Sequence, residues 1–431
     1  MFDGVQPTAV IVVASAEDVG RVIAYARANN VAFAVRSGGH AYAGWSTGTG
    51  LVIDTRGLAG VGALAADGTA AIGAGTQLID VYSTFAAQGV AVSGGSCATV
   101  GFSGLALGGG HGFTSRAYGL ACDAVVAMEV VTADGVVHQC DENNDADLFW
   151  ACRGGGGSFG VVTKMIVRPH PIPPVATTFE LTYSWHNAGD ALARWMQWVP
   201  SLPGATMTGA RLQKAQSLQL VVLGLHLGPV AEAKQVLAPI LAGAASSSIA
   251  SRPFVDALML EAGCTHRTLT ACHNSGISAG GTLPRQTPFV ASSHYFGTPL
   301  SSDAIAAAMS AVQHRAAHAD TATMQFDSYG GAIAGIANDA TAFVHRNAFC
   351  SAQYGSYFTS GDGSDDRAWI RSTRAAMGPF SNGEAYQNYV DPELDGWAQA
   401  YYGANLARLQ SVKRAVDPDN VFTFPQSIPL T

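Results

Sequence analysis

Apolar and polar positions along the first forty residues predict a strand, a helix and a second strand. Residues 9–14 form a continuous apolar, β-branched run that suits a buried strand. Ser15, with Asp18 three residues later, resembles a capping box that opens a helix reaching Arg27. A second β-branched run, residues 31–36, follows directly and leads into a glycine turn.

The rest of the chain divides by its glycine content. Between about residues 51 and 170, short β-rich runs alternate with glycine-dense connections, which indicates an α+β unit. After the proline-rich segment 169–174 the glycine density falls and Ala-rich, helix-like stretches appear, at 188–198, 229–241 and 302–318. This proline cluster is the predicted domain boundary. A last helix is expected over 401–416.

Length and charge limit the classes of function. A chain of 431 residues with 48% apolar content suits two domains rather than one core. Charged residues make up 13%, the net charge is -8, and no basic run could neutralise a phosphate backbone, so nucleic acid is not an expected partner. Apolar runs such as 218–225 are too short to span a membrane. No secretory signal is visible, and localisation stays open.

The seven cysteines have no spacing typical of a zinc or iron–sulfur site, so no metal is predicted. An odd number leaves at least one of them outside any intramolecular disulfide. Composition does not say which one.

Three glycine-rich loops are the main chemical signal. The first, Arg36-Ser37-Gly38-Gly39-His40, can aim backbone N–H groups at an anion, although two adjacent glycines also suit an ordinary tight turn. The second, 94–112, has eight glycines in nineteen residues, and the third spans 153–162. No Lys-Ser/Thr follows as in a P-loop, and the Rossmann fingerprint is absent. Three such loops in one half of the chain therefore suggest a binding site for a large planar ligand that carries phosphates.

The motifs RSGGH, GGSCATVG, LGGGHGF, YGLACD, DLFWACRGGGGSFGVVT and YQNYVDPEL, with a C-terminal DPDNVFTFPQSI, occur in this order along the chain. Together they resemble the berberine-bridge-enzyme-like branch of the vanillyl-alcohol-oxidase flavoprotein family. The resemblance covers about residues 8–170 and 380–428.

The resemblance implies an α+β fold with a PCMH-type FAD-binding domain of two α+β subdomains. That domain is expected to comprise residues 1–170, completed by 402–431. Residues 171–401 would form a substrate domain, an antiparallel sheet backed by helices, with a berberine-bridge-like segment from about residue 380.

The resemblance also implies FAD that is bonded covalently at two points. His40 matches the histidine that joins the flavin 8α-methyl group, and Cys97 matches the cysteine that joins flavin C6. Both linkages need a nucleophilic atom held against the ring, and glycine loops give that access. The remaining positions that match FAD contacts are Arg36, Ser37, Gly38, Gly39, Ala41, Thr99, Val100, Gly101, Gly104, Gly109, Gly110, Gly112, Tyr118, Gly160, Val162 and Asn405.

Tyr389 matches the tyrosine of the family's Asn-Tyr-x-Asp segment and is the candidate catalytic base. An ordinary tyrosine has a pKa of about 10, so its phenolate would need local stabilisation. Tyr389 could instead be a half-buried strand residue, since Tyr386 and Val390 fit a strand pattern. Berberine-type members carry a glutamate after Tyr-Gly-Gly, but here Ala332–Gly335 follows. That departure argues against alkaloid ring closure.

Phe102 stands five residues after Cys97, where the family is taken to have an oxygen gatekeeper. Its bulk leaves oxidase and dehydrogenase as alternatives, with oxidase and hydrogen peroxide formation favoured. Bicovalent members of the family oxidise carbohydrates, so the expected substrate is an alcohol group of a sugar or oligosaccharide. The expected electron acceptor is O2, and the protein is expected to be a monomer. The alternatives are a tailoring oxidase of a secondary metabolite and an inactive flavin-carrying protein.

Overall fold

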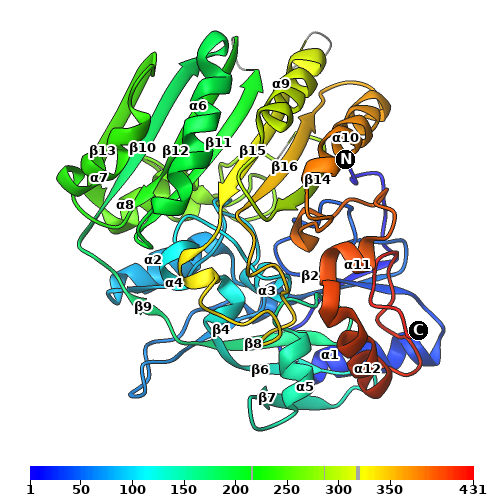
Figure 1. Ribbon diagram of the computed structural model, residues 1–431. Helices are drawn as coiled ribbons and strands as arrows, with labels where there is room; N and C mark the ends of the chain where they lie inside the picture. Colours follow the sequence, from blue (N-terminus) through cyan, green and yellow to red (C-terminus); the bar gives the residue numbers. More distant parts are fainter. Residues whose placement is uncertain (215–216, 286, 317–320) are drawn as a thin grey trace.

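Two layered regions lie one above the other in the computed structural model, which describes residues 1–214, 217–285, 287–316 and 321–431 (Figure 1). The lower region holds a three-stranded and a four-stranded sheet with their helices. The upper region holds a seven-stranded antiparallel sheet. Helices and strands are mixed in both regions, so the predicted α+β class is confirmed.

The predicted opening of strand, helix and strand is confirmed as β1 (Ala9–Val12), α1 (Ala16–Ala28) and β2 (Phe33–Arg36). The Ser15 hydroxyl accepts a hydrogen bond from Asp18 N, while the Asp18 carboxylate accepts one from Ala14 N. Strand β3 (Leu51–Asp54) inserts between β1 and β2, and all three run parallel. Their carboxyl ends therefore share one edge, where the loop containing His40 begins.

The second lower sheet has the order β4-β8-β6-β7 and is antiparallel. Its packing follows from strands rich in apolar residues such as β8, whose buried Val162 and Met165 join one core with the helices. Its elements are β4 (Ala70–Gly73), β6 (Val125–Val131), β7 (Val137–Asp141), β8 (Val161–Val167), α2 (Leu78–Ala87), α3 (Phe102–Leu107), α4 (Ser115–Tyr118) and α5 (Ala146–Ala151).

The upper sheet has the order β13-β10-β12-β11-β15-β16-β14, with antiparallel pairing throughout. Its strands are β10 (Val175–Ser184), β11 (Thr206–Lys214), β12 (Leu218–His226), β13 (Ser246–Pro253), β14 (Phe289–Phe296), β15 (Thr321–Ser328) and β16 (Cys350–Tyr357). Along β15, Met324 and Phe326 are buried on one face while Gln325 and Asp327 take the other. Because side chains alternate across a strand, one face is apolar and the other polar.

Helices cover the apolar face of this sheet. They are α6 (Trp185–Trp198), α9 (Ser302–Ala316) and α10 (Ser364–Met377), and they pack with the sheet into one core around Trp195. The helix predicted at 229–241 is shorter, as α7 (Val230–Leu237) and a following 3-10 turn. Positions 317 and 318 of the helix expected over 302–318 lie outside the described residues. Helix α8 (Phe254–Glu261) packs instead on the lower core.

The single helix expected over 401–416 is wrong. The chain forms α11 (Trp397–Tyr402), a 3-10 turn and α12 (Leu406–Val416). Gly403 breaks the helix with a φ of +46°, and the Asn405 amide donates to the carbonyls of Asn338, Thr341 and Ala342. The tail then returns to the N-terminal sheet, where Phe422 meets Phe33 edge to face.

The passage between the regions lies just after the proline cluster. Strand β9 (His170–Pro171) pairs with β5 (Val90–Ala91) of the lower region, and β10 enters the upper sheet at Val175. The predicted limits of the FAD and substrate domains stay predictions.

Candidate active site

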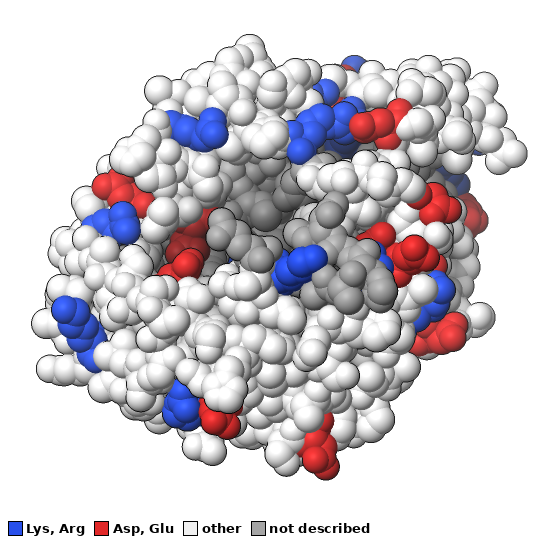
Figure 2. Space-filling view, turned by 90° about the horizontal axis from the view of Figure 1, so that it is seen from above, with Lys and Arg blue, Asp and Glu red and all other residues white. Residues whose placement is uncertain are grey.

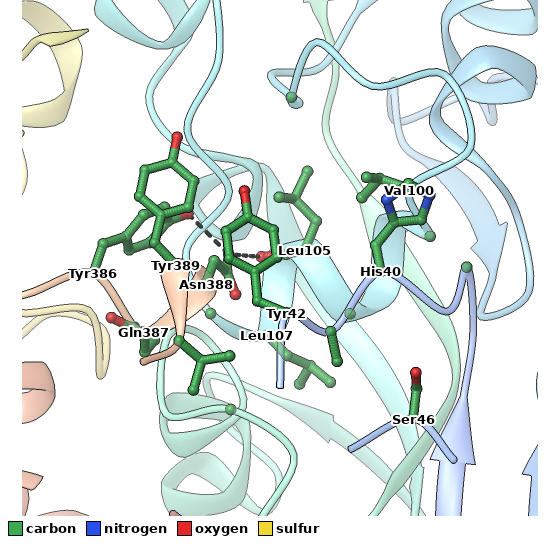
Figure 3. A pocket seen from close by; sticks show the side chains of 18 of the residues that line it. His40, Tyr42, Ser46, Val100, Leu105, Leu107, Tyr386, Gln387, Asn388 and Tyr389 are labelled. Carbon is green, nitrogen blue, oxygen red and sulfur yellow. Dashed lines mark hydrogen bonds between the residues drawn. The ribbon is translucent and has the colours of Figure 1, made fainter. Parts of the chain in front are cut away.

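A cavity of about 710 Å³ opens between the lower region and the polar face of the upper sheet. This size is within the usual range for ligand and cofactor sites. Figure 3 shows His40 on one side of it, Tyr389 on the other and Tyr42 between them. This cavity is lined by the first two glycine-rich loops, by the end of the third and by the turn at 386–390.

The loop of His40 and the loop of Cys97 pack backbone against backbone. A Cβ on Gly38 would lie 2.2 Å from Gly101 N, and one on Gly101 would lie 2.1 Å from the Ser37 hydroxyl. Only glycine allows this approach, so these two glycines bring the two loops together. Gly104 differs, because a Cβ there would meet nothing within 4 Å.

His40 lies against the Cys97 loop through Thr99. Its Nε2 is 2.8 Å from the Thr99 hydroxyl. Among the described residues, its Nδ1 has no hydrogen-bond partner. Burial lowers the pKa of His40 below its ordinary value, which favours the neutral, nucleophilic imidazole.

Most predicted site residues line the cavity. They are Ser37, Gly38, Gly39, His40, Ala41, Cys97, Val100, Gly101, Gly104, Gly112, Gly160, Val162 and Tyr389. Cys97 is exposed, and the described disulfide joins Cys264 and Cys272 instead.

Other predicted FAD contacts have their side chains elsewhere. Arg36 donates to Asp54, at the shared edge of β2 and β3. Burial alone would raise the pKa of Asp54, but hydrogen bonds from Arg56 and Arg36 hold it below its ordinary value. Tyr118 donates to the Pro171 carbonyl and stacks on His170.

Three more of these positions serve the packing around the loops. Gly109 and Gly110 have positive φ and lie directly against Phe343 and Ala121. Asn405 caps the carbonyls beyond β15, as described above. As cofactor contacts, these positions stay predictions.

Phe102 does not line the cavity. It begins α3 and is fully buried in the lower core. Val100, three residues after Cys97, lines the cavity instead (Figure 3). The gatekeeper role of Phe102 stays a prediction, and this placement gives its side chain no access to the ligand space.

Tyr389 lies in a 3-10 turn, Gln387–Tyr389, so the alternative that it belongs to a strand is wrong. Its ring stacks on that of Tyr42, and the Tyr42 hydroxyl accepts a hydrogen bond from Gln353. Burial raises the pKa of Tyr389 well above its ordinary value, and the charge of Asp327 raises it further. The expected stabilisation of a phenolate is therefore not provided by these residues.

The sequence reasoning missed the polar face of the upper sheet. Arg211, Gln325, Asp327 and Gln353 line the cavity from three neighbouring strands. Arg211 Nε donates to Gln325, and Gln325 Nε2 donates to Asp327, at 2.7 Å each. The alternation Thr-Met-Gln-Phe-Asp in β15 was the available signal, because it sets polar residues two apart on one face.

FAD fits the groups that line this cavity. Three polar atoms in its wall are buried without a hydrogen-bond partner in the described chain: His111 Nε2, Gln387 Oε1 and Gln426 Oε1. Leaving such atoms unsatisfied costs about 1–3 kcal/mol each, so they suit a bound group with its own donors and acceptors. The open backbone at Gly104 leaves room beside them.

The described residues contain no group of three or more His, Cys, Asp or Glu that could hold a metal ion. Within the same ranges, no helix has the length and apolar content needed to cross a membrane.

Comparisons with known proteins agree on one family. Residues 7–141 match the family model described as "FAD binding domain", and residues 385–429 match "Berberine and berberine like". The chain is 33% identical to the FAD-linked oxidoreductase YgaK of Bacillus subtilis (strain 168), over 98% of this chain and 91% of that protein. It is 27% identical to the chitooligosaccharide oxidase of Gibberella zeae, over 98% and 87%.

A solved structure, Physcomitrella patens BBE-like 1, superposes with a TM-score of 0.90 at 27% identity, over 99% of this chain and 92% of that one. The fold and the cavity thus define an FAD-dependent oxidoreductase. The chain belongs to the berberine-bridge-enzyme-like family of these enzymes, and FAD is its cofactor.

Proposed function

We propose that this enzyme oxidises an alcohol group of a carbohydrate or oligosaccharide, with FAD bonded through His40 and Cys97 and with O2 reduced to hydrogen peroxide. The main support for this proposal is that two sets of residues line the same cavity. One set contains the two attachment residues, and the other contains Tyr389 and a row of polar side chains on the upper sheet.

The polar row suits a substrate with many hydroxyl groups. Gln325, Asp327 and Gln353 offer amide donors and carboxylate or amide acceptors within one sheet face. Two relatives, named a chitooligosaccharide oxidase and a carbohydrate oxidase, support the same substrate class at 27% identity each.

The chemistry needs a hydride acceptor and a proton acceptor. FAD, when bound, accepts the hydride from the carbon that bears the hydroxyl. Tyr389 is a neutral phenol at neutral pH, because burial raises its pKa. We therefore assign Tyr389 to contact the substrate hydroxyl and Asp327, which lines the same cavity from β15, to receive the proton.

The attachment at His40 is supported by its local contacts. Thr99 can hold Nε2, which leaves Nδ1 for the bond to the flavin, and the neutral ring is favoured by burial. The exposed Cys97 lines the same cavity. Its loop is held to the His40 loop by the Gly38–Gly101 contact.

The acceptor is proposed to be O2. Phe102 had made this doubtful, but its side chain is packed in the core and does not narrow the cavity. The proposed organisation is a monomer with FAD bound by 1–170 and 402–431 and the substrate by 171–401.

The deciding experiment uses the purified holoenzyme under anaerobic conditions. A panel of mono- and disaccharides should bleach the flavin absorbance, and air should restore it with one equivalent of hydrogen peroxide. Bleaching without rapid recovery in air would indicate a dehydrogenase. If no sugar bleaches the flavin, the carbohydrate proposal is wrong and a secondary-metabolite substrate takes its place.

A further inference from the structure

Glu261 lines the active-site cavity, but neither the proposed hydride transfer nor the proposed proton transfer uses it. It is the last residue of α8, whose buried Phe254, Ala257 and Leu258 fix the helix in the lower core. In the described chain, the Glu261 carboxylate has no hydrogen-bond or ion-pair partner within the cavity.

A disulfide supports the end of α8. The bond between Cys264 and Cys272 packs with Ile79 and Ala98, next to Cys97, in a small buried cluster. The residue after Glu261, Ala262, belongs to the same cluster. Glu261 therefore projects from a rigid support, as a binding group needs to.

Arg211 faces the same space from β11. Its Nε is committed to Gln325, which orients the guanidinium plane, while its terminal nitrogens have no partner among the described residues. Arg211 and Glu261 act on each other electrostatically, yet no ion pair within 4 Å joins them in the described ranges. A carboxylate and a guanidinium thus lie apart, both with unused hydrogen-bonding capacity.

Leu223 forms an apolar floor between them. It stands on β12, between β10 and β11, on the face that bears Arg211. Leu223 is half-buried, lines the cavity and belongs to neither hydrophobic core. A polar rim around an apolar floor matches a sugar ring, which has hydroxyls at its edge and C–H groups on its face.

We propose that Arg211 and Glu261 form a second sugar subsite, which holds two neighbouring hydroxyls of a unit that is not oxidised. The carboxylate accepts from the hydroxyl protons, and the guanidinium donates to the hydroxyl oxygens. This inference rests on the proposed function and narrows its substrate to a disaccharide or longer chain.

Strand spacing supports a separate subsite. Helix α8 packs on β10 and β13, and β10 lies three strands from the β15 strand that carries Asp327. Neighbouring strands are about 4.8 Å apart, so β10, on which the helix of Glu261 packs, is roughly 14 Å from β15, and Arg211 on β11 stands between the two. That separation exceeds one sugar ring and suits two linked units.

The subsite also predicts a pH dependence. Burial raises the pKa of Glu261 to about 7. Three charges face it from the sheet: Arg211 on β11 and Arg252 on β13 lower this pKa, and Glu180 on β10 raises it. Glu261 gains its charge as the pH rises through about 7. The KM for a disaccharide should then fall between about pH 6 and about pH 8, while the KM for the matching monosaccharide should not change.

The test compares matched sugars, glucose with cellobiose and xylose with xylobiose, by steady-state kinetics of the holoenzyme. Glu261→Gln and Arg211→Gln should each raise the disaccharide KM at least about tenfold, because hydrogen bonds to charged groups are lost. For Glu261→Gln, the monosaccharide KM and both kcat values should stay within about twofold. Arg211→Gln is compared by its disaccharide KM alone, because Arg211 also holds Gln325 beside Asp327. Glu261→Gln should also remove the pH dependence.

Glu142→Gln is the matched control, since Glu142 is exposed, does not line the cavity and is not among the charges that act on Glu261. It should change neither KM. If Arg211→Gln does not fold, Glu261→Gln alone decides. Equal effects of Glu261→Gln on mono- and disaccharides would overturn the subsite and leave the proposed function intact. Failure of every sugar to bleach the wild-type flavin would overturn both.

Discussion

The ring of Tyr389 stacks on the ring of Tyr42, with centroids 5.8 Å apart and planes at 10°. The contact joins two distant parts of the chain, the turn 387–389 and the segment after His40. Gln353, on a strand of the upper sheet, donates a hydrogen bond to the Tyr42 hydroxyl at 2.9 Å and so joins this sheet to the same contact. The ring of Tyr389 is therefore held by contacts that link three separate segments of the chain.

Tyr389→Phe should lower kcat by about 10²–10⁴-fold, because it removes the hydroxyl proposed to take part in proton transfer. The ring remains and keeps the stack on Tyr42, so FAD content should not change. Anaerobic flavin bleaching by the best sugar measures the step directly. A variant that bleaches at the wild-type rate would exclude Tyr389 from the proton transfer.

The two proposed covalent bonds to FAD can be tested separately by single substitutions. His40→Ala and Cys97→Ala should each leave one bond, so acid precipitation should keep the yellow colour in the pellet. The double variant should release the flavin into the supernatant. Wild-type protein that releases its flavin would show that the cofactor is not covalently bound.

Phe102→Ala should lower stability by about 3–5 kcal/mol, because it removes a large side chain from a closed core. The rate at which the reduced flavin reacts with O2 should stay within about twofold, since the side chain does not reach the cavity. Stopped-flow mixing of the reduced enzyme with air-saturated buffer measures this rate. A marked acceleration would restore Phe102 as the oxygen gatekeeper.

Lys413 links the C-terminal helix to the loop that precedes β8. Its buried ammonium donates to Asp417, to the Ser158 carbonyl and to the Phe422 carbonyl. Burial lowers its pKa, although Asp417 opposes that shift. Lys413→Met should cost about 3–5 kcal/mol, because Asp417 would remain buried without its cation.

Thermal unfolding of the holoenzyme measures this loss, and Arg414→Met on the exposed side of the same helix is the control. The control should shift the midpoint little. Equal shifts in both variants would argue against a special role for the buried pair.

The sequence by itself determined the opening strand, helix and strand and the cofactor class, because these depend on local patterns and on motif order, while the two attachment residues stay predictions. Ser15 and Asp18 act at the helix start much as their spacing predicts, and Gly39 takes the positive φ that its turn needs. Such features depend on residues close together in the chain.

Only the tertiary structure decided which side chains share the cavity. Arg211 and Asp327 stand 116 positions apart, yet β11 and β15 are neighbours in the sheet. Phe102 lies within the glycine-rich segment 94–112, but the start of α3 turns its ring into the core. Strand order and side-chain direction arise from packing over the whole chain, so no local pattern could assign them.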